Sequence, residues 1–321
     1  MFVNTVRKKI FPCKKIADLL SFFSGAGVFD RRGYRVFLRK RTVLGHGTET
    51  ALKKYGFIGA GNMGYPLLMG AAGLVGKENV TFSTPFEEEN EKVKARSGID
   101  YSRDTVALAE ESENIVICVK PQMIDKVFED LNRADIAGKT VISIAAGVTC
   151  ERLHNSISQD VRIVRIMPNT PAMVGEGMSC ICFTDYAGGC NAAQKLDVTN
   201  LFGAVGRYEI IPEKLMNAAI CANGSSPAYV YMFIEALADS VVKYGIPRDM
   251  AYRLAAQTVL GSAKMVLETG EHPGKLKDNV CSPGGTTIAA VEALEEAGLR
   301  NALFKATDAC YKRGEELQKG V

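Results

Sequence analysis

The sequence predicts an α/β fold in which a doubly wound parallel sheet is followed by an all-α C-terminal domain. Through residue 167, short β-rich runs alternate with helical stretches, which is typical of a parallel sheet with crossover helices. After about residue 215 the strand pattern ends, and helices rich in alanine, leucine and methionine follow. We therefore expect a basic leader at 1–52 outside the fold, a sheet domain at 53–214 and a helical domain at 215–321.

The individual elements follow from local patterns. Buried strands are expected at 55–58, 80–83, 115–119, 141–144 and 162–167. Helices are expected between them at 65–72, 87–97 and 102–111. In the second part, Ser225-Ser226-Pro227 predicts a helix start with a hydroxyl cap, and glycines end the helices at 244 and 269. A further helix is expected at 288–297.

Composition excludes several classes of protein. The chain has 321 residues, 47% hydrophobic and 23% charged, as globular proteins do. Nine cysteines without a C-x-x-C pair, and only three histidines, argue against a metal site and favour a reducing compartment. Residues 53–321 carry 28 bases and 33 acids, which argues against nucleic acid as a partner. The uncharged stretch 55–76 contains seven glycines, so a buried strand and glycine turn explain it better than a membrane span.

The leader, residues 1–52, carries eleven Lys and Arg against three acids. Three interpretations remain open: an organellar transit peptide, a basic arm, or upstream sequence that is not part of the functional fold. The third is favoured, with the functional chain beginning near Leu52, where the first strand opens. A cytoplasmic location follows from that choice, and an organellar one from the transit peptide.

The strongest local signal is Gly59-Ala60-Gly61-Asn62-Met63-Gly64, placed directly after a buried strand and before a helix. In a G-x-G-x-x-G turn the first glycine allows the tight turn, the second lets backbone approach a pyrophosphate, and the third lets helix pack on strand. The helix N-terminus adds free N–H groups for the phosphates. The motif in this context predicts a Rossmann-type dinucleotide site.

The sequence at the end of the second strand indicates whether the site prefers NADPH or NADH. An NAD site usually has an acid there for the ribose hydroxyls, whereas this chain has Ser83-Thr84-Pro85. Hydroxyls tolerate a 2′-phosphate, so NADPH is preferred, with NADH as the alternative. The loops around Lys120, at 143–148 and at 167–171 follow later strands and are candidates for the same cleft.

A second signal lies in the helical part, where Ser282-Pro283-Gly284-Gly285-Thr286-Thr287 precedes a helix. Two consecutive glycines weaken a simple helix start, but they expose N–H groups beside two hydroxyls. This arrangement favours an anion site suited to a carboxylate.

These segments together resemble the pyrroline-5-carboxylate reductase family. The matching pieces cover essentially residues 53–319, and they are 56–63, 119–122, 143–148, 167–171, 225–229 and 272–288. The resemblance implies reduction of 1-pyrroline-5-carboxylate to L-proline with NAD(P)H by an enzyme whose helical domains form a homodimer, often within a ring of dimers.

The resemblance also implies roles for residues. The cofactor would contact Gly59, Ala60, Gly61, Asn62, Met63, Gly64, Thr84, Ser102, Val119, Lys120, Pro121, Ala146 and Asn279. The substrate would contact Ser225, Gly284, Gly285, Thr286 and Thr287. The Thr287 hydroxyl would face the ring nitrogen and is the catalytic candidate.

Two departures and two alternatives remain. Ser226 stands where the family usually has glycine, and Glu271 adjoins the position at which some relatives carry a carboxylate, so it receives no role. A β-hydroxyacid dehydrogenase-type reductase would use a helix lysine, and 227–236 contains none. A non-catalytic nucleotide sensor would have no need of the intact turn at 282–287.

Overall fold

The computed structural model describes residues 28–29, 35–36 and 51–318. Two compact units divide the chain, Met1–Thr50 and Ala51–Val321. In the first, β1 (Val28–Phe29) pairs antiparallel with β2 (Arg35–Val36). Most of the leader lies outside the described residues, so its three interpretations stay predictions.

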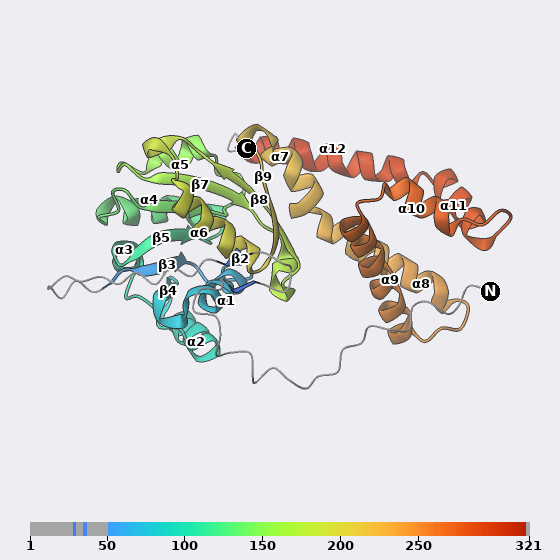
Figure 1. Cartoon of the computed structure of the whole chain (residues 1–321), viewed down its shortest axis with the longest axis horizontal. Helices are drawn as coiled ribbons and strands as arrows, with labels where there is room; N and C mark the ends of the chain where they lie inside the picture. The colour runs from blue at the N-terminus through green and yellow to red at the C-terminus, as the bar shows by residue number, and fades with distance from the viewer. Residues whose placement is uncertain (1–27, 30–34, 37–50, 319–321) are drawn as a thin grey trace. The chain divides into compact units, whose positions relative to one another are not determined.

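The second unit is built on a seven-stranded sheet of order β4-β3-β5-β6-β7-β8-β9 (Figure 1). The strands are β3 (Lys53–Ile58), β4 (Val80–Ser83), β5 (Ser112–Ile117), β6 (Thr140–Ser143), β7 (Arg162–Met167), β8 (Gly177–Phe183) and β9 (Gly206–Ile210). All neighbours are parallel except β7 and β8. The predicted doubly wound sheet is therefore confirmed, with one reversed pair.

β8 runs antiparallel to β7 because the chain that connects the two strands is short. A parallel neighbour needs a crossover of about a dozen residues or more, and the chain between Met167 and Gly177 is shorter than that. It forms a short 3₁₀ helix, Thr170–Val174, followed by Gly175 at φ +77°. The chain then returns antiparallel to β7.

Helices cover both faces of the sheet, and strand side chains alternate between two apolar clusters. Phe57 packs with α1 (Gly64–Val75) and α6 (Ala192–Gly203), whereas its neighbour Ile58 packs on the opposite side. That second side is covered by α3 (Thr105–Glu110), α4 (Ile124–Arg133) and α5 (Cys150–Ser156). Such two-sided burial explains the continuous apolar runs in the strands.

The remaining elements follow in chain order. They are α2 (Glu87–Ser97), α7 (Met216–Ala219), α8 (Ser226–Val242), α9 (Arg248–Thr269), α10 (Pro273–Val280), α11 (Thr286–Glu296) and α12 (Leu299–Gln318). A π-helix, Ile220–Gly224, joins α7 to α8. Further 3₁₀ turns lie at Lys77–Asn79, Pro121–Met123, Tyr186–Gly188 and Glu213–Leu215.

One expectation about α8 is wrong. Ser225 does not cap the helix, because the π-helix runs directly into α8 and Ser225 has helical φ/ψ of −93° and −29°. Its hydroxyl accepts from the Cys310 thiol instead, at 3.3 Å. The helix also ends at Val242, before the expected 244, and Gly245 follows at φ +96°.

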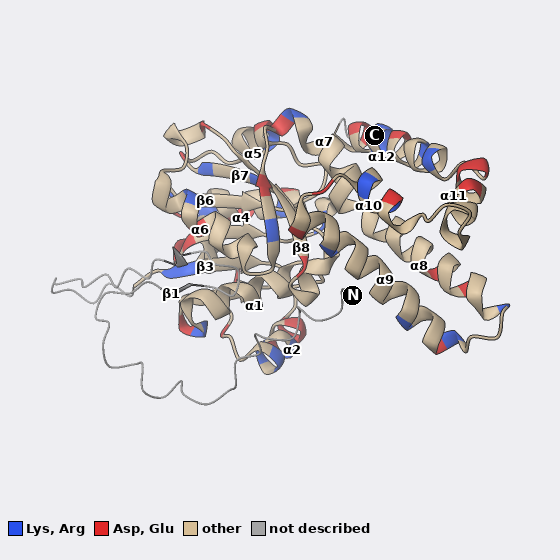
Figure 2. Cartoon of the chain, turned by 45° about the vertical axis from the view of Figure 1, so that its right-hand side comes forward, with Lys and Arg blue, Asp and Glu red and all other residues tan. Residues whose placement is uncertain are grey.

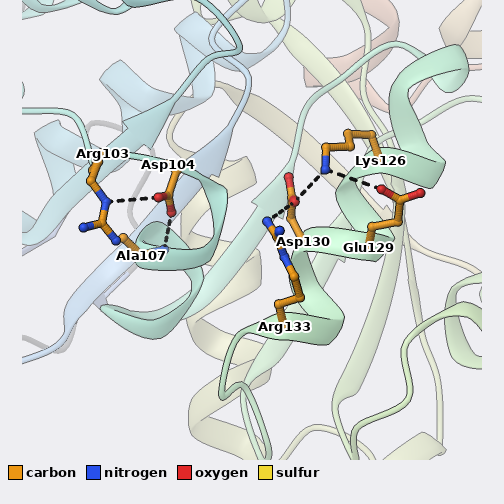
Figure 3. A network of polar contacts seen from close by, with 7 residues as sticks. All are labelled: Arg103, Asp104, Ala107, Lys126, Glu129, Asp130 and Arg133. Atoms are coloured by element: carbon orange, nitrogen blue, oxygen red, sulfur yellow. Dashed lines mark hydrogen bonds and ion pairs between the residues drawn. The ribbon is translucent and has the colours of Figure 1, made fainter.

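Charged residues of both signs lie on the surface helices, as Figure 2 shows for α2 and α12. On α4, Asp130 accepts from Lys126 at 3.1 Å and from Arg133 at 2.6 Å (Figure 3). Exposed pairs of this kind contribute little to the free energy of unfolding.

The N-terminus of α3 has a side-chain cap that contributes to the free energy of unfolding. Asp104 accepts from the Ala107 N–H at 2.8 Å, which lowers the pKa of the Asp104 carboxyl (Figure 3). Replacing Asp104 by alanine should lower the free energy of unfolding by about 1 kcal/mol. Chemical denaturation measures it. Arg103→Ala is the control, because Arg103 forms only an exposed pair with Asp104. Equal losses in both variants would contradict the assignment.

Candidate active site

The three glycines of the motif differ in why the position needs glycine. Gly59 has φ +94°, a conformation that favours glycine, and its N–H donates to the Ser83 carbonyl at 2.8 Å. At Gly64 a Cβ would lie 2.4 Å from the Gly59 carbonyl oxygen, so the helix can approach the loop only without a side chain. At Gly61, by contrast, a Cβ would meet nothing within 4 Å. The protein's own packing thus requires Gly59 and Gly64 but leaves the space at Gly61 free.

The start of α1 suits a phosphate group. Met63 offers no side-chain cap, and the first turn of this 12-residue helix has no acid. Its N–H groups and positive dipole end lie directly after the open position at Gly61. The residues present therefore fit the pyrophosphate of a dinucleotide.

The loop after β4 is fixed by a residue that sequence reasoning missed. Asn90, which is buried, accepts from the Thr84 N–H at 2.8 Å and from the Thr84 hydroxyl at 2.9 Å. The first acid beyond this loop, Glu87, accepts from the Tyr101 hydroxyl. Asn90 therefore fixes the loop and engages both donors of Thr84, and what favours a 2′-phosphate here is that the loop has no free carboxylate. An asparagine shortly after a Thr-Pro turn was the available signal.

The ends of β5 and β6 lie beside the glycine loop. A Cβ on Gly59 would lie 3.3 Å from Val119, and one on Gly64 would lie 3.1 Å from the Cys118 Cβ. Burial raises the pKa of the Cys118 thiol, which keeps it neutral beneath the loop. The β6 loop joins this edge through the Ile144 N–H, which donates to the Ile117 carbonyl at 3.1 Å.

Other predicted cofactor residues differ in exposure. Lys120, Pro121 and Ala146 are exposed at these strand ends, as ligand-binding residues can be. Ser102 is buried, and its hydroxyl contacts Thr81 and Glu111, so that side chain is already engaged within the protein. Asn279 is exposed on α10.

The predicted substrate turn has an uncapped helix behind it. Gly284 has φ +67°, and the Gly285 N–H donates to the Ser282 carbonyl at 3.0 Å, which closes the turn. Gly285 is the N-cap of α11 and has no side chain to satisfy the first N–H groups, and no acid lies in the first turn. Thr287 is half-buried in that turn. The turn can therefore offer N–H donors and hydroxyls to an anion.

A pair of asparagines connects the end of β7 to the π-helix before α8. Asn169 donates to the Asn223 carbonyl at 3.1 Å, and Asn223 donates to the Met167 carbonyl at 2.9 Å. Asn223 precedes the predicted substrate residue Ser225 by two positions. Sequence reasoning noted the rigid 167–171 loop but missed this connection, which only the fold brings together.

The glycine loop and the turn at 282–287 are not joined directly. Among residues 51–318, no hydrogen bond or ion pair links Gly59–Gly64 to residues 279–287. The structure thus brings together the predicted cofactor loops of β3, β4, β5 and β6, and builds the substrate turn separately on α10 and α11.

The helical part exposes unusually many large apolar side chains. The fully buried members of the α8–α9 cluster are only alanines, namely Ala238, Ala251 and Ala255. Exposed apolar residues in the helical part include Met232 and Phe233 on α8, Leu260 on α9 and Leu303 on α12. Large apolar side chains exposed in this number favour an interface with another chain.

Comparison with known proteins bears on the whole arrangement. A model of the family described as pyrroline-5-carboxylate reductase dimerisation matches residues 213–317. A model described as NADP oxidoreductase coenzyme F420-dependent matches residues 54–147. Pyrroline-5-carboxylate reductase of Escherichia coli K12 is 44% identical over 269 residues, 83% of this chain and 99% of that protein.

The chain belongs to the pyrroline-5-carboxylate reductase family. The Arabidopsis thaliana member is 40% identical over 83% of this chain and 96% of its own length. Among solved structures, the Coxiella burnetii member matches with a TM-score of 0.76 and 31% identity over 83% of this chain and 98% of that one. The Plasmodium falciparum member, solved with NADP bound, matches with a TM-score of 0.73 and 32% identity over 85% of this chain and 100% of that one.

Family membership confirms the resemblance and the fold inferred from the sequence. The dimerisation match covers the helices that expose apolar side chains, so this part of the family fold serves homo-oligomerisation. None of the helices in residues 51–318 combines the length and apolarity needed to cross a bilayer.

Proposed function

We propose that this chain is an oxidoreductase that reduces 1-pyrroline-5-carboxylate to L-proline, the last step of proline biosynthesis, with NADPH as the reductant. The observation that carries the proposal is the uncapped turn at Gly284–Thr287, placed in a family member whose glycine loop leaves Gly61 open. One feature suits a carboxylate and the other a pyrophosphate.

The proposed division of labour follows the two kinds of site. Residues 53–214 would bind the nucleotide, through the backbone of Gly59, Ala60, Gly61, Asn62, Met63 and Gly64. Thr84 would contact the ribose phosphate, and the cleft would be lined by Ser102, Val119, Lys120, Pro121 and Ala146, with Asn279 from the helical part. Residues 215–321 would bind substrate and form the dimer.

The proposed reaction needs little acid–base catalysis by the protein. NADPH supplies the hydride, and a protonated cyclic imine accepts it readily. Gly284, Gly285 and Thr286 hold the substrate carboxylate at the start of α11, while Ser225 lies at the start of α8. The Thr287 hydroxyl hydrogen-bonds the ring nitrogen and orients the imine carbon for attack.

The direct test follows nicotinamide absorbance with purified protein, 1-pyrroline-5-carboxylate and either NADPH or NADH. The six-membered cyclic imine and a β-keto acid serve as alternative substrates. Oxidation of NADPH with formation of L-proline is expected. Turnover of the β-keto acid alone would favour the β-hydroxyacid dehydrogenase alternative, and cofactor binding without any turnover would favour a nucleotide sensor.

Thr287 offers a sharper test of the substrate site. Replacing Thr287 by alanine should lower kcat/KM for the imine about tenfold, because one hydrogen bond to the ring nitrogen is lost. Thr287→Ser, which keeps the hydroxyl, should retain most of the activity. Thr258→Ala is the control, since the Thr258 hydroxyl only donates to the Leu254 carbonyl on α9. Wild-type kinetics in Thr287→Ala would remove the proposed role.

We propose a homodimer formed through α8, α9, α11 and α12, with a ring of dimers as the larger assembly. The double substitution Met232→Asp with Phe233→Asp should produce monomers, because it places two charges on the exposed apolar face of α8. Light scattering coupled to gel filtration measures the mass. Leu196→Asp, similarly exposed but on α6, should leave the mass unchanged. An intact oligomer in the double variant would place the interface elsewhere.

We propose a cytoplasmic location, because the basic leader is favoured as sequence outside the functional fold over a transit peptide. Fractionation of cells, with N-terminal sequencing of the native chain, distinguishes this from import into an organelle.

A further inference from the structure

A buried cation lies on the face of the sheet that carries α5. Arg165 on β7 is 2% exposed, the largest side chain that is fully buried among the described residues. Its Nη1 lies 2.9 Å from the Glu213 Oε1, whereas its Nη2 has no hydrogen-bond partner within residues 51–318. The reductase chemistry proposed above makes no use of this charge.

Two thiols share this environment. Cys182 on β8 is the cross-strand partner of Arg165, so both side chains project to the same face. Cys150 begins α5, and its N–H donates to the Glu213 Oε1 at 2.7 Å. Cys150 and Cys182 line the same cavity, and each thiol affects the titration of the other. The two sulfur atoms are therefore neighbours although 32 residues separate them in the sequence.

A cavity gives small molecules a route to both thiols. Cys150 and Cys182 line a cavity of about 490 Å³, together with Tyr186 and Glu213. Each cysteine is otherwise almost fully buried, at 1% and 4% exposure. A molecule near the size of water can therefore reach sulfur atoms that a protein partner cannot.

The two thiols are also electrostatically unlike. The neighbouring Cys150 thiol and the charge of Arg165 lower the pKa of Cys182, against the opposing effects of burial and Glu213. The contact with Cys182 and burial raise the pKa of Cys150. Burial likewise raises the pKa of Cys180 and Cys190. Because the Arg165 guanidinium lies directly across the strand pair from Cys182, its positive charge favours the thiolate at Cys182, and Cys150 is the neighbouring thiol.

We propose that Cys150 and Cys182 form a redox-active dithiol that hydrogen peroxide oxidises to a disulfide, with Cys182 attacking and Cys150 resolving. The Cys182 thiolate attacks one peroxide oxygen, the O–O bond breaks, and the departing hydroxide takes up the proton released by Cys182 to become water. The Cys150 sulfur then attacks the resulting sulfenic acid. The S–O bond breaks, and the hydroxyl leaves with the Cys150 proton as a second water.

Electrons and atoms balance in this sequence, because two thiols lose two electrons and one peroxide becomes two waters. A dithiol reductant reverses the reaction by exchange. The disulfide would tie the start of α5 to β8, close in sequence to the β6 loop that contains Ala146. Nothing in the proposal depends on the reductase reaction, so the two fail separately.

The experiment uses the full-length reduced protein and hydrogen peroxide alone. After oxidation, unreacted thiols are alkylated and the protein is digested without reductant for peptide mass analysis. We expect a cross-linked pair containing Cys150 and Cys182, a loss of two hydrogens from the intact mass, and recovery of both thiols with dithiothreitol. The peptide map of the oxidised wild-type chain tests whether the disulfide forms, and it needs no variant.

Three substitutions test the assigned roles. In Cys182→Ser, oxidation of Cys150 should slow by about tenfold or more, since the attacking thiolate is absent. In Cys150→Ser, Cys182 should remain reactive and be trapped by dimedone as the sulfenic acid. Cys190→Ser, the control, should form the cross-link at the wild-type rate. Oxidation of Cys150 and Cys182 no faster than Cys190, or unchanged Cys150 oxidation in Cys182→Ser, would overturn the proposal.

Discussion

Replacing Gly61 by aspartate should raise the KM for NADPH by about a hundredfold, equivalent to about 3 kcal/mol of binding free energy. A Cβ at this position meets no protein atom within 4 Å, so the new side chain disturbs no packing. It instead fills the space that the pyrophosphate would occupy and places a negative charge beside it. Steady-state kinetics gives the KM, and thermal unfolding should give an unchanged Tm.

Gly73→Asp is the matched control for this effect. Gly73 lies on α1, the helix that follows the glycine loop, and a Cβ there also meets nothing within 4 Å. That variant should bind NADPH as the wild type does. Gly64→Ala should behave in the opposite way to Gly61→Asp and lose stability, because its Cβ would lie 2.4 Å from the Gly59 carbonyl oxygen. Equal KM values for Gly61→Asp and Gly73→Asp would show that the pyrophosphate binds elsewhere.

Removing the charge of Glu213 should lower the free energy of unfolding by about 3 kcal/mol, since it leaves Arg165 buried and unpaired. Glu213→Gln keeps the shape of the side chain and isolates the charge. Arg165→Met should cost less, because the Glu213 left behind is 34% exposed and can reach water. Denaturant unfolding at one protein concentration measures the wild type, both single variants and the double variant, and the double variant should lose less than the sum of the single losses.

The effect of Glu213 should depend on pH in a defined direction. Burial alone would raise the pKa of this carboxyl, but the Cys150 N–H and the Arg165 guanidinium outweigh it and lower the pKa. A lowered pKa means that the stabilisation is present above the ordinary glutamate value of 4.5 and is lost as the pH falls through the folded-state pKa. The gap between wild type and Glu213→Gln should therefore shrink in acid. A gap that stays constant with pH would mean that charge is not its cause.

Local patterns in the sequence were sufficient for the first strands of the large sheet and for several of the helices. Strands at 80–83 and 162–167 and helices at 87–97 and 248–269 have the predicted bounds, because buried β-branched runs and glycine ends are strong signals. β8 and β9 were missed. Gly177–Phe183 contains two cysteines and a serine among its apolar residues, and its strand identity depends on pairing with β7.

The candidate site was predictable only where one segment carries the chemistry. The glycine loop and the turn at 282–287 each have a motif whose backbone geometry the sequence dictates. The contacts of Asn90 with Thr84 and of Asn223 with Met167 join segments by side-chain hydrogen bonds. The Asn90 contact is local and had a weak signal in the Thr-Pro turn before it, whereas the Asn223 contact spans 56 residues, and only the fold decides that those segments meet. The roles of individual site residues stay predictions until the variants are measured.

The alanines between α8 and α9 have a consequence for how this chain folds and assembles. Ala238, Ala251 and Ala255 bury little area, so a lone polypeptide gains little free energy from completing these helices. The sheet can form by a first-order process, whereas the bundle must wait for a collision with another copy. Recovery of native structure after dilution from denaturant should then show a slow phase whose rate rises with the concentration of the chain.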